Sequence, residues 1–457
     1  METTMSQTTR PSTSPARPSR TYTRRDLRTR MAELWRPDAD PKVYRNLLIG
    51  LGALMAVFSI FPLGNSLLGW WNKDYDLWFI VGWYYRHGGV LYPTDGRPFP
   101  YMYPPAAAML LSVLSVVGRG AFVGMLVALQ SASWIGSILL SVWLATGRTL
   151  RQAPGLYLVP TLFVVPCIHD MYLLGQPNLL LLFLLLGAFA SLRVGRPWLS
   201  GSLVALAAAI KAFPVLALGY FVWRREWKAV GATLLWLVLL LLVLPLPFRG
   251  RTQTWQDMTV WTKGMVLKYD EGQIAQRPDR CYSFKNQALV AVTNRLLRDL
   301  PADGESRDGW QVNFASLNFK TVNLITAAIG LSLCLFYVIA MPPKRLRDPR
   351  VLAAETAMLT LLILAFSPFA FNYFYVWILY PVTVLLARVL EAPAGSRERQ
   401  VLRIGLITAL SVFASSIVSV KITQAYGNLL ATDLILLGLL GWVLIRRDDS
   451  EQATAEM

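Results

Sequence analysis

Two carboxylates stand two residues apart inside an aromatic stretch of the sequence. The stretch WWNKDYDLWFIVGWYYRHGG, residues 70–89, carries Asp74 and Asp76 among tryptophans and tyrosines. A carboxylate near an apolar interface can accept a proton, because partial desolvation raises its basicity. Two structural roles are also open. Asp76 could be the N-cap of the following helix, and Asp74 could be a solvated loop acid.

Other polar residues stand within apolar runs or at their ends, where polar groups are costly and usually functional. They come from at least five separate connections, and the topology below puts them on the outer side. Such a one-sided set indicates a cavity at the outer membrane face rather than a pore through the middle. Besides the two acids, the set comprises Tyr101, Tyr103, His169, Asp170, Gln176, Asn178, Lys211, Lys285, Asn286, Gln287, Asn372 and Tyr373.

Each of these signals also has a structural interpretation. His169 could be a satisfied interfacial histidine, and Lys211 could extend its ammonium to the interface. The GQPN segment at 175–178 reads equally well as a turn between two spans. The aromatics of 70–103 suit an interfacial belt, although aromatic faces also stack on sugars.

The composition shows what kind of chain must position these residues. The chain has 457 residues, of which 54% are hydrophobic and only 16% charged; a soluble chain is usually about a quarter charged. Apolar runs of about 17–25 residues match the length that crosses a bilayer. The net charge of +17 is concentrated at the ends of these runs, so it indicates topology and contact with anionic lipids rather than nucleic acid. Three cysteines and two histidines predict neither a disulfide framework nor a metal site, and no cofactor is expected.

The sequence predicts an all-α polytopic membrane protein with about twelve transmembrane helices. Residues 1–45 form a basic, disordered cytoplasmic tail, 46–447 the membrane domain, and 448–457 a second cytoplasmic tail. The positive-inside rule favours a short helix at 104–118 along the outer interface instead of a span. Large outer loops are then expected at 69–119 and 248–318, the second with an amphipathic interfacial piece at 286–300. The predicted spans are 47–68, 120–146, 155–171, 178–192, 199–211, 213–223, 229–247, 319–341, 352–370, 373–390, 402–420 and 427–445.

Five sequence pieces occur in a recognisable order. They are YDLWFIVGWYYRHGGVLYP, FPYMYPPAAAMLL, LLGQPNLLLLFLLL, LSGSLVALAAAIKAFPVLALGYFVWRREWK and SFKNQALVAVTNRLL. In their order and spacing, over about residues 47–390, the chain resembles the family 87 glycosyltransferases. These are polyprenol-phosphate-mannose-dependent α-mannosyltransferases of bacteria with the GT-C architecture, so the resemblance implies that fold, with interfacial helices at the outer face.

The family's motifs fall on particular residues of this chain. The acid of the first outer loop falls on Asp76, with Asp74 as the second choice. The remaining matches are a Tyr-Pro-Pro step at Tyr103, Pro104 and Pro105, a Gly-Gln-x-Asn turn at Gly175, Gln176 and Asn178, the lysine at Lys211, and an Asn-Gln-Ser at Asn286, Gln287 and Ala288, which has alanine in place of serine.

The resemblance implies an integral membrane glycosyltransferase of the bacterial plasma membrane. It would move a sugar, with mannose favoured, from a polyprenyl-phosphate donor to a hydroxyl of a glycolipid or glycan at the outer face, with inversion. Asp76 would be the general base, while Lys211, His169 and Lys285 would bind the phosphate. A transporter or flippase of lipid-linked or anionic substrates is the alternative. The sugar and acceptor would contact Tyr101, Tyr103, Gln176, Asn178, Asn286, Gln287, Asn372 and Tyr373.

Overall fold

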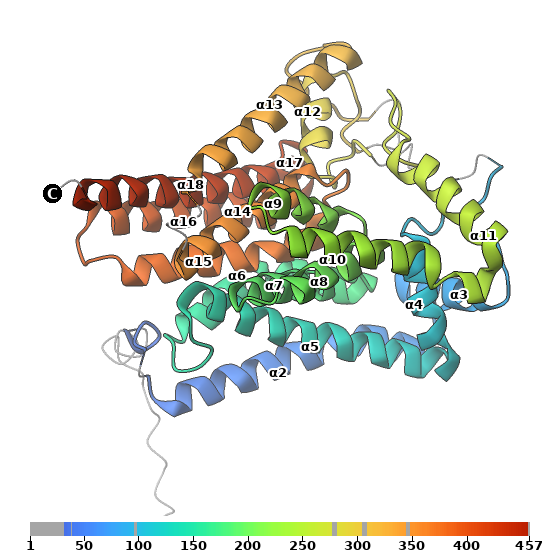
Figure 1. Ribbon diagram of the computed structural model, residues 1–457, viewed down its shortest axis with the longest axis horizontal. Helices are drawn as coiled ribbons and strands as arrows, with labels where there is room; N and C mark the ends of the chain where they lie inside the picture. The colour runs from blue at the N-terminus through green and yellow to red at the C-terminus, as the bar shows by residue number, and fades with distance from the viewer. Residues whose placement is uncertain are drawn as a thin grey trace, which may run out of the picture.

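The chain is an all-α polytopic membrane protein (Figure 1). The computed structural model describes residues 32–37, 39–95, 98–276, 281–303, 309–343 and 348–455. Within these ranges the only β-type pairing is an isolated bridge between Tyr269 and Ile274. Most of the predicted tail 1–45 lies outside the described residues, but the first long helix already begins at Pro41. The last helix continues to Ala455, through most of the predicted tail 448–457.

Eight helices of the described ranges are long and apolar enough to cross a membrane. A bent pair could supply a ninth span: α10 (Trp227–Val238) with η3 (Leu239–Val243), and α11 (Leu246–Trp261) with η4 (Thr262–Val266), meet at 94°. The predicted count of about twelve is not confirmed, because α7 (Asn178–Arg193), α8 (Pro197–Ile210) and η2–α9 (Phe213–Leu216, Ala217–Trp223) are shorter apolar helices. The eight are α2 (Pro41–Leu67), α5 (Arg119–Thr146), α6 (Gly155–Leu174), α13 (Phe319–Ala340), α14 (Pro349–Phe366), η6–α15 (Asn372–Ile378, Leu379–Glu391), α16 (Arg397–Val418) and α18 (Asn428–Ala455).

Burial separates central helices from peripheral ones. The apolar windows of α14 and of η6–α15 are each 83% buried, whereas those of α2 and α13 are only 11% buried. Apolar side chains on a peripheral helix can face lipid, so α2 and α13 have the pattern of lipid-exposed helices. In Figure 1, α2 runs beside α5 along one edge, and α13 projects from the opposite edge. At the centre, the buried Arg224 pairs with Glu355 and joins the end of α9 to α14.

The first predicted outer loop contains a packed helix pair. Helix α3 (Asp74–Arg86) lies against α4 (Pro105–Leu114), which continues as η1 (Ser115–Val117). Gly82 permits this close approach, since a Cβ there would lie 2.6 Å from the Leu111 carbonyl oxygen. At about 1.5 Å per residue, thirteen residues reach about 20 Å, too short for a core of about 30 Å. Arg119 at the start of α5 contacts Asp76, so segment 69–119 begins and ends at the same end of the bundle.

The second predicted outer loop contributes α11 and α12 (Leu289–Leu297). Six of the nine α12 residues are buried, and the helix packs against α13 and α14. The amphipathic piece predicted at 286–300 therefore uses its apolar face for contacts inside the protein. A short helix, α17 (Val420–Ala425), joins α16 to α18 beside this region.

Candidate active site

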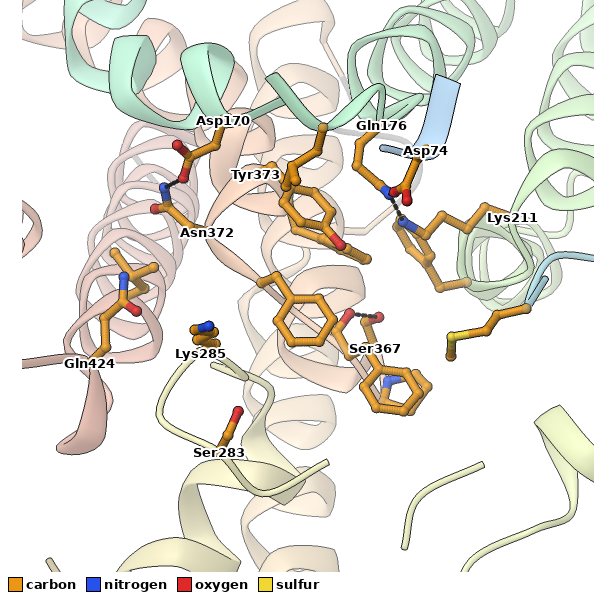
Figure 2. A pocket seen from close by; sticks show the side chains of 18 of the residues that line it. Asp74, Asp170, Gln176, Lys211, Ser283, Lys285, Ser367, Asn372, Tyr373 and Gln424 are labelled. Carbon is orange, nitrogen blue, oxygen red and sulfur yellow. Dashed lines mark hydrogen bonds between the residues drawn. The ribbon is translucent and has the colours of Figure 1, made fainter. Parts of the chain in front are cut away.

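One cavity of about 1910 Å³ opens among the helices at the end of the bundle that carries α3 and α12. Two predicted outer loops line it, together with α6, α16, α17 and the segments before and within η6. Figure 2 shows its polar side chains in three groups, around Gln176, around Asp170 and around Lys285. Nine of the predicted site residues line it: Asp74, Tyr101, Tyr103, His169, Gln176, Lys211, Lys285, Asn372 and Tyr373.

The junction of α6 and α7 places Gln176 in this cavity. Gly175 ends α6 with a φ of +85°, a conformation that glycine adopts without steric cost. A Cβ at Gly175 would lie 2.8 Å from the ring of Tyr75, so α3 packs directly on the turn. The GQPN segment is thus a turn, as one interpretation predicted, and the same turn delivers a side chain to the cavity.

Gln176 joins the acid and the cation of the site. Its Nε2 donates to an oxygen of Asp74, while its Oε1 accepts from the Tyr103 hydroxyl at 2.8 Å and lies 3.4 Å from Lys211 Nζ. Only 4% of Gln176 is exposed, so these contacts fix its orientation. We call these four residues the Gln176 hub.

Lys211 reaches the hub from the end of α8, where the helix stops. Its Nζ donates to Asn178 Oδ1 at 3.2 Å and stands 3.8 Å from the centre of the Phe374 ring, a cation–π distance. Asn178 is fully buried and donates to the Tyr373 carbonyl oxygen. The structure therefore turns Asn178, a predicted sugar contact, toward holding Lys211 in place.

Two tyrosines form the wall between α3 and α4. Burial raises the pKa of Tyr101 and of Tyr103 well above the ordinary value, so both phenols stay protonated. Tyr103 is then a stable donor to Gln176, and its ring lies 4.5 Å from that of Trp78. Tyr101 uses its hydroxyl on the Pro104 carbonyl oxygen at 3.2 Å.

The two acids of α3 point in different directions. Asp74 is the first residue of the helix and lines the cavity. Asp76 is the third residue, so it is not the N-cap, and only 3% of it is exposed. Its carboxylate accepts from Arg119 Nε at 2.6 Å and Nη2 at 2.9 Å, and from the Asn72 backbone N–H at 2.6 Å. Asp76, the predicted base, thus lies in the first turn of α3 beside the cavity, where its carboxylate is paired with Arg119.

A second polar group lies on α6 and η6. His169 Nδ1 is 3.5 Å from Asp170 Oδ1, and the other carboxylate oxygen of Asp170 accepts from Asn372 Nδ2 at 2.6 Å. The His169 ring meets Phe58 edge-on at 5.4 Å. About two fifths of each of the His169 and Asp170 side chains is exposed, so both are accessible from the cavity.

Asn286 and Gln287, predicted to bind sugar or acceptor, are fully buried and bond to backbone. Asn286 donates to the carbonyl oxygens of Cys281 and Pro368 and accepts from two backbone N–H groups. Gln287 donates to the Phe284 and Gln424 carbonyl oxygens. These amides hold segment 281–287, which brings Ser283 and Lys285 to the cavity.

Sequence reasoning missed several polar residues of this region, of which four matter for the site. In the sequence, Arg119 served only to infer topology. As a cation directly after the α3–α4 pair, it could also have indicated a partner for the acids of α3. The other three, Ser283, Lys421 and Gln424, line the cavity itself. Lys421 and Gln424 lie in α17, between two predicted spans, where the sequence shows no motif.

The rest of the cavity wall is apolar. Helices α6 and α16 supply it, and the wall continues to surface that α16 exposes, including Ile417, which is 80% exposed. Such a wall suits an acyl or prenyl chain better than a water-filled path. Its side chains include Val159, Leu162, Phe163, Val165, Leu410, Phe413 and Ile417.

A helical membrane bundle with an acid, a cation and an apolar wall around one cavity has the parts that a membrane enzyme acting on lipid-linked substrates requires. Residues 101–368, more than half of the chain, match the model of glycosyltransferase family 87, and the chain belongs to this family.

Curated relatives cover smaller parts of the chain. It is 32% identical over 145 residues to a polyprenol-phosphate-mannose-dependent alpha-(1-2)-phosphatidylinositol pentamannoside mannosyltransferase of Mycolicibacterium smegmatis, which is 31% of this chain and 33% of that one. A protein of the same description from Mycobacterium tuberculosis is 27% identical over 193 residues, 40% of this chain and 43% of that one. The chain thus spans between a third and a half of these relatives' lengths. No solved structure matches the chain.

Proposed function

We propose that the chain is a membrane glycosyltransferase that takes mannose from polyprenol-phosphate-mannose and transfers it to a hydroxyl of an acceptor at the outer membrane face. One observation carries the proposal: the Gln176 hub places an acid, Asp74, and a cation, Lys211, on one amide inside a cavity with an apolar wall. Family membership and the names of the relatives supply the donor.

The chemistry assigned to Asp74 is general-base catalysis. The acceptor hydroxyl loses its proton to the Asp74 carboxylate as its oxygen attacks C1 of the sugar. The bond between C1 and the phosphate oxygen breaks, and polyprenyl phosphate leaves with the bonding electrons. One displacement inverts the anomeric centre, so a β-linked donor gives an α-glycoside. We assign the base to Asp74 rather than Asp76 because Asp74 lines the cavity and Asp76 is bound to Arg119.

The remaining parts of the cavity fit the rest of the donor. The prenyl chain lies along the wall of α6 and α16, where Leu162 and Phe413 line the cavity. The phosphate gains charge as it leaves, and the lining side chains Lys211 and His169 bind it. Tyr103 and Tyr373 offer aromatic faces to the sugar, and Asn372 offers an amide.

The test is transfer of labelled mannose from polyprenol-phosphate-mannose by the purified chain in lipid, with Asp74→Asn beside the wild type. We expect a new glycosidic bond with the wild type and a loss of at least about 100-fold in rate with the variant. Asp270→Asn is the matched control, because Asp270 is an exposed loop acid. Movement of a lipid-linked sugar across liposomes without a new bond would instead establish a transporter.

A further inference from the structure

A second polar region lies in the cavity at the contact between segment 281–287 and α17. Ser283 and Lys285 line the cavity from the segment, and Lys421 and Gln424 line it from α17. Gln287 Nε2 donates to the Gln424 carbonyl oxygen at 2.6 Å, so the two pieces of chain touch. Figure 2 shows Lys285, Ser283 and Gln424 on the side away from the Gln176 hub.

The side-chain amide of Gln424 faces the cavity. Only 5% of the residue is exposed. Its backbone carbonyl oxygen accepts from Gln287, Arg295 and Gly427, but its side-chain amide has no hydrogen bond within the described part of the chain. The amide can therefore donate to a ligand in the cavity.

Two lysines beside this amide supply positive charge. Lys285 and Lys421 are exposed and line the cavity, and neither forms an ion pair among the residues that the structure describes. The other cavity lysines differ: Lys211 bonds to Gln176 and Asn178, and Lys268 is 3.6 Å from Asp270. Lys285 and Lys421 are thus the cavity lysines whose charge is most available to an anion.

Arg295 fixes the two pieces of chain relative to each other. It is fully buried, and its guanidinium donates to five backbone carbonyl oxygens, those of Tyr282, Ser283, Asn286, Gln424 and Ala425. Three of these belong to segment 281–287 and two to α17. A guanidinium has five N–H groups in a rigid plane, so a single side chain sets the spacing between Lys285 and Gln424.

We propose that Lys285, Lys421 and Gln424 form a lipid-phosphate-binding subsite of the cavity and that Arg295 is its positioning residue. Two cations and an amide donor are the groups that bind a phosphate, and the apolar wall of α16 beside α17 would receive the lipid chain. The class of ligand, a phosphate carried by a lipid, is taken from the proposed function. That phosphate belongs to the donor or to an acceptor lipid.

The test measures lipid binding by the purified full chain in nanodiscs of a neutral lipid. The probes are a polyprenyl phosphate without sugar and phosphatidylinositol. We expect Lys285→Ala/Lys421→Ala to bind one probe at least about 30-fold more weakly and with less dependence on salt. The probe affected identifies the donor or the acceptor phosphate. Lys320→Ala, exposed at the start of α13, is the control, and equal affinities of this variant and the double variant for both probes overturn the proposal.

Arg295→Lys separates positioning from stability. It keeps a charge but has three donors in place of five, so we expect it to lose roughly tenfold in affinity for the affected probe and part of the salt dependence. A variant that is merely less stable, with wild-type affinity and salt dependence in its folded fraction, contradicts the positioning role. Because binding needs no turnover, a wild-type chain that binds lipid phosphate at these lysines but transfers no sugar refutes the proposed function and leaves the subsite.

Discussion

The choice between Asp74 and Asp76 as the base can be tested by separating stability from turnover. The perturbations are Asp74→Asn, Asp76→Asn, Arg119→Gln and the double variant Asp76→Asn/Arg119→Gln. Asp74 lines the cavity, whereas Asp76 is 3% exposed and contacts Arg119 through both carboxylate oxygens. If contacts decide the roles, Asp74→Asn should lose turnover and Asp76→Asn should lose stability.

The expected loss of stability on breaking the Asp76–Arg119 pair follows from the burial of the two side chains. Breaking a fully buried ion pair costs about 3–5 kcal/mol, and an exposed pair is worth about 0–1 kcal/mol. The Asp76 side chain is 5% exposed and that of Arg119 is 30% exposed, so water partly screens the pair. We therefore expect a coupling free energy of about 2 kcal/mol in the double-mutant cycle. The assay is reversible unfolding in mixed detergent micelles.

The expected effect of Asp74→Asn is on the transfer rate and not on stability. An amide at this position can still accept the hydrogen bond from Gln176, so the free energy of unfolding should change by less than about 1 kcal/mol. Loss of a general base should lower the transfer rate by about 10²–10⁴-fold. Asp76→Asn, corrected for its folded fraction, should stay within about tenfold of the wild type. The reasoning is refuted if Asp76→Asn loses about 100-fold or more with unchanged stability while Asp74→Asn retains turnover.

Three further predictions follow from single contacts. Gly175→Ala should lose about 1–3 kcal/mol of unfolding free energy and much of the transfer rate, because Gly175 has a φ of +85° and lies against the Tyr75 ring. The control is Gly219→Ala, which has open space around it and should match the wild type in both assays. Asn286→Ala should lower the thermal midpoint strongly, since it leaves four buried backbone groups without their partner. Lys211→Met should lower kcat/KM for the labelled donor about 10- to 100-fold with little change in thermal midpoint, and a wild-type kcat/KM would exclude Lys211 from the site.

The sequence predicted much of the fold and many of the polar residues that line the cavity. Apolar length and positive charge located the helices, and the family's motifs brought Gln176, Lys211 and Tyr103 to one cavity. The number of spans was predicted less well. Chain segments such as α7 and α8 are apolar enough for a span but have only 16 and 14 residues, and hydropathy alone does not distinguish a short buried helix from a crossing one.

The direction of a side chain was harder to predict than its neighbourhood. Residues two apart on a helix point about 200° apart. The position at which α3 begins therefore determines which of the two acids faces the cavity. That start depends on Lys73, which has a φ of +49° and carries no turn signature. Asn286 and Gln287 are a second example. The sequence predicted them in the cavity, but tertiary packing directs their amides toward backbone groups.

The Gln176 hub also explains why an amide suits this position better than an acid or an apolar side chain. Asp74 requires a donor from Gln176, while Lys211 and Tyr103 require an acceptor. A carboxylate at 176 would repel Asp74, and a thioether of similar length would leave both charges without this partner. The glutamine amide offers a donor to the acid and an acceptor to the lysine at the same time, and it carries no charge itself. In the proposed reaction this arrangement keeps the acid that accepts a proton and the lysine that binds the leaving phosphate on one side chain.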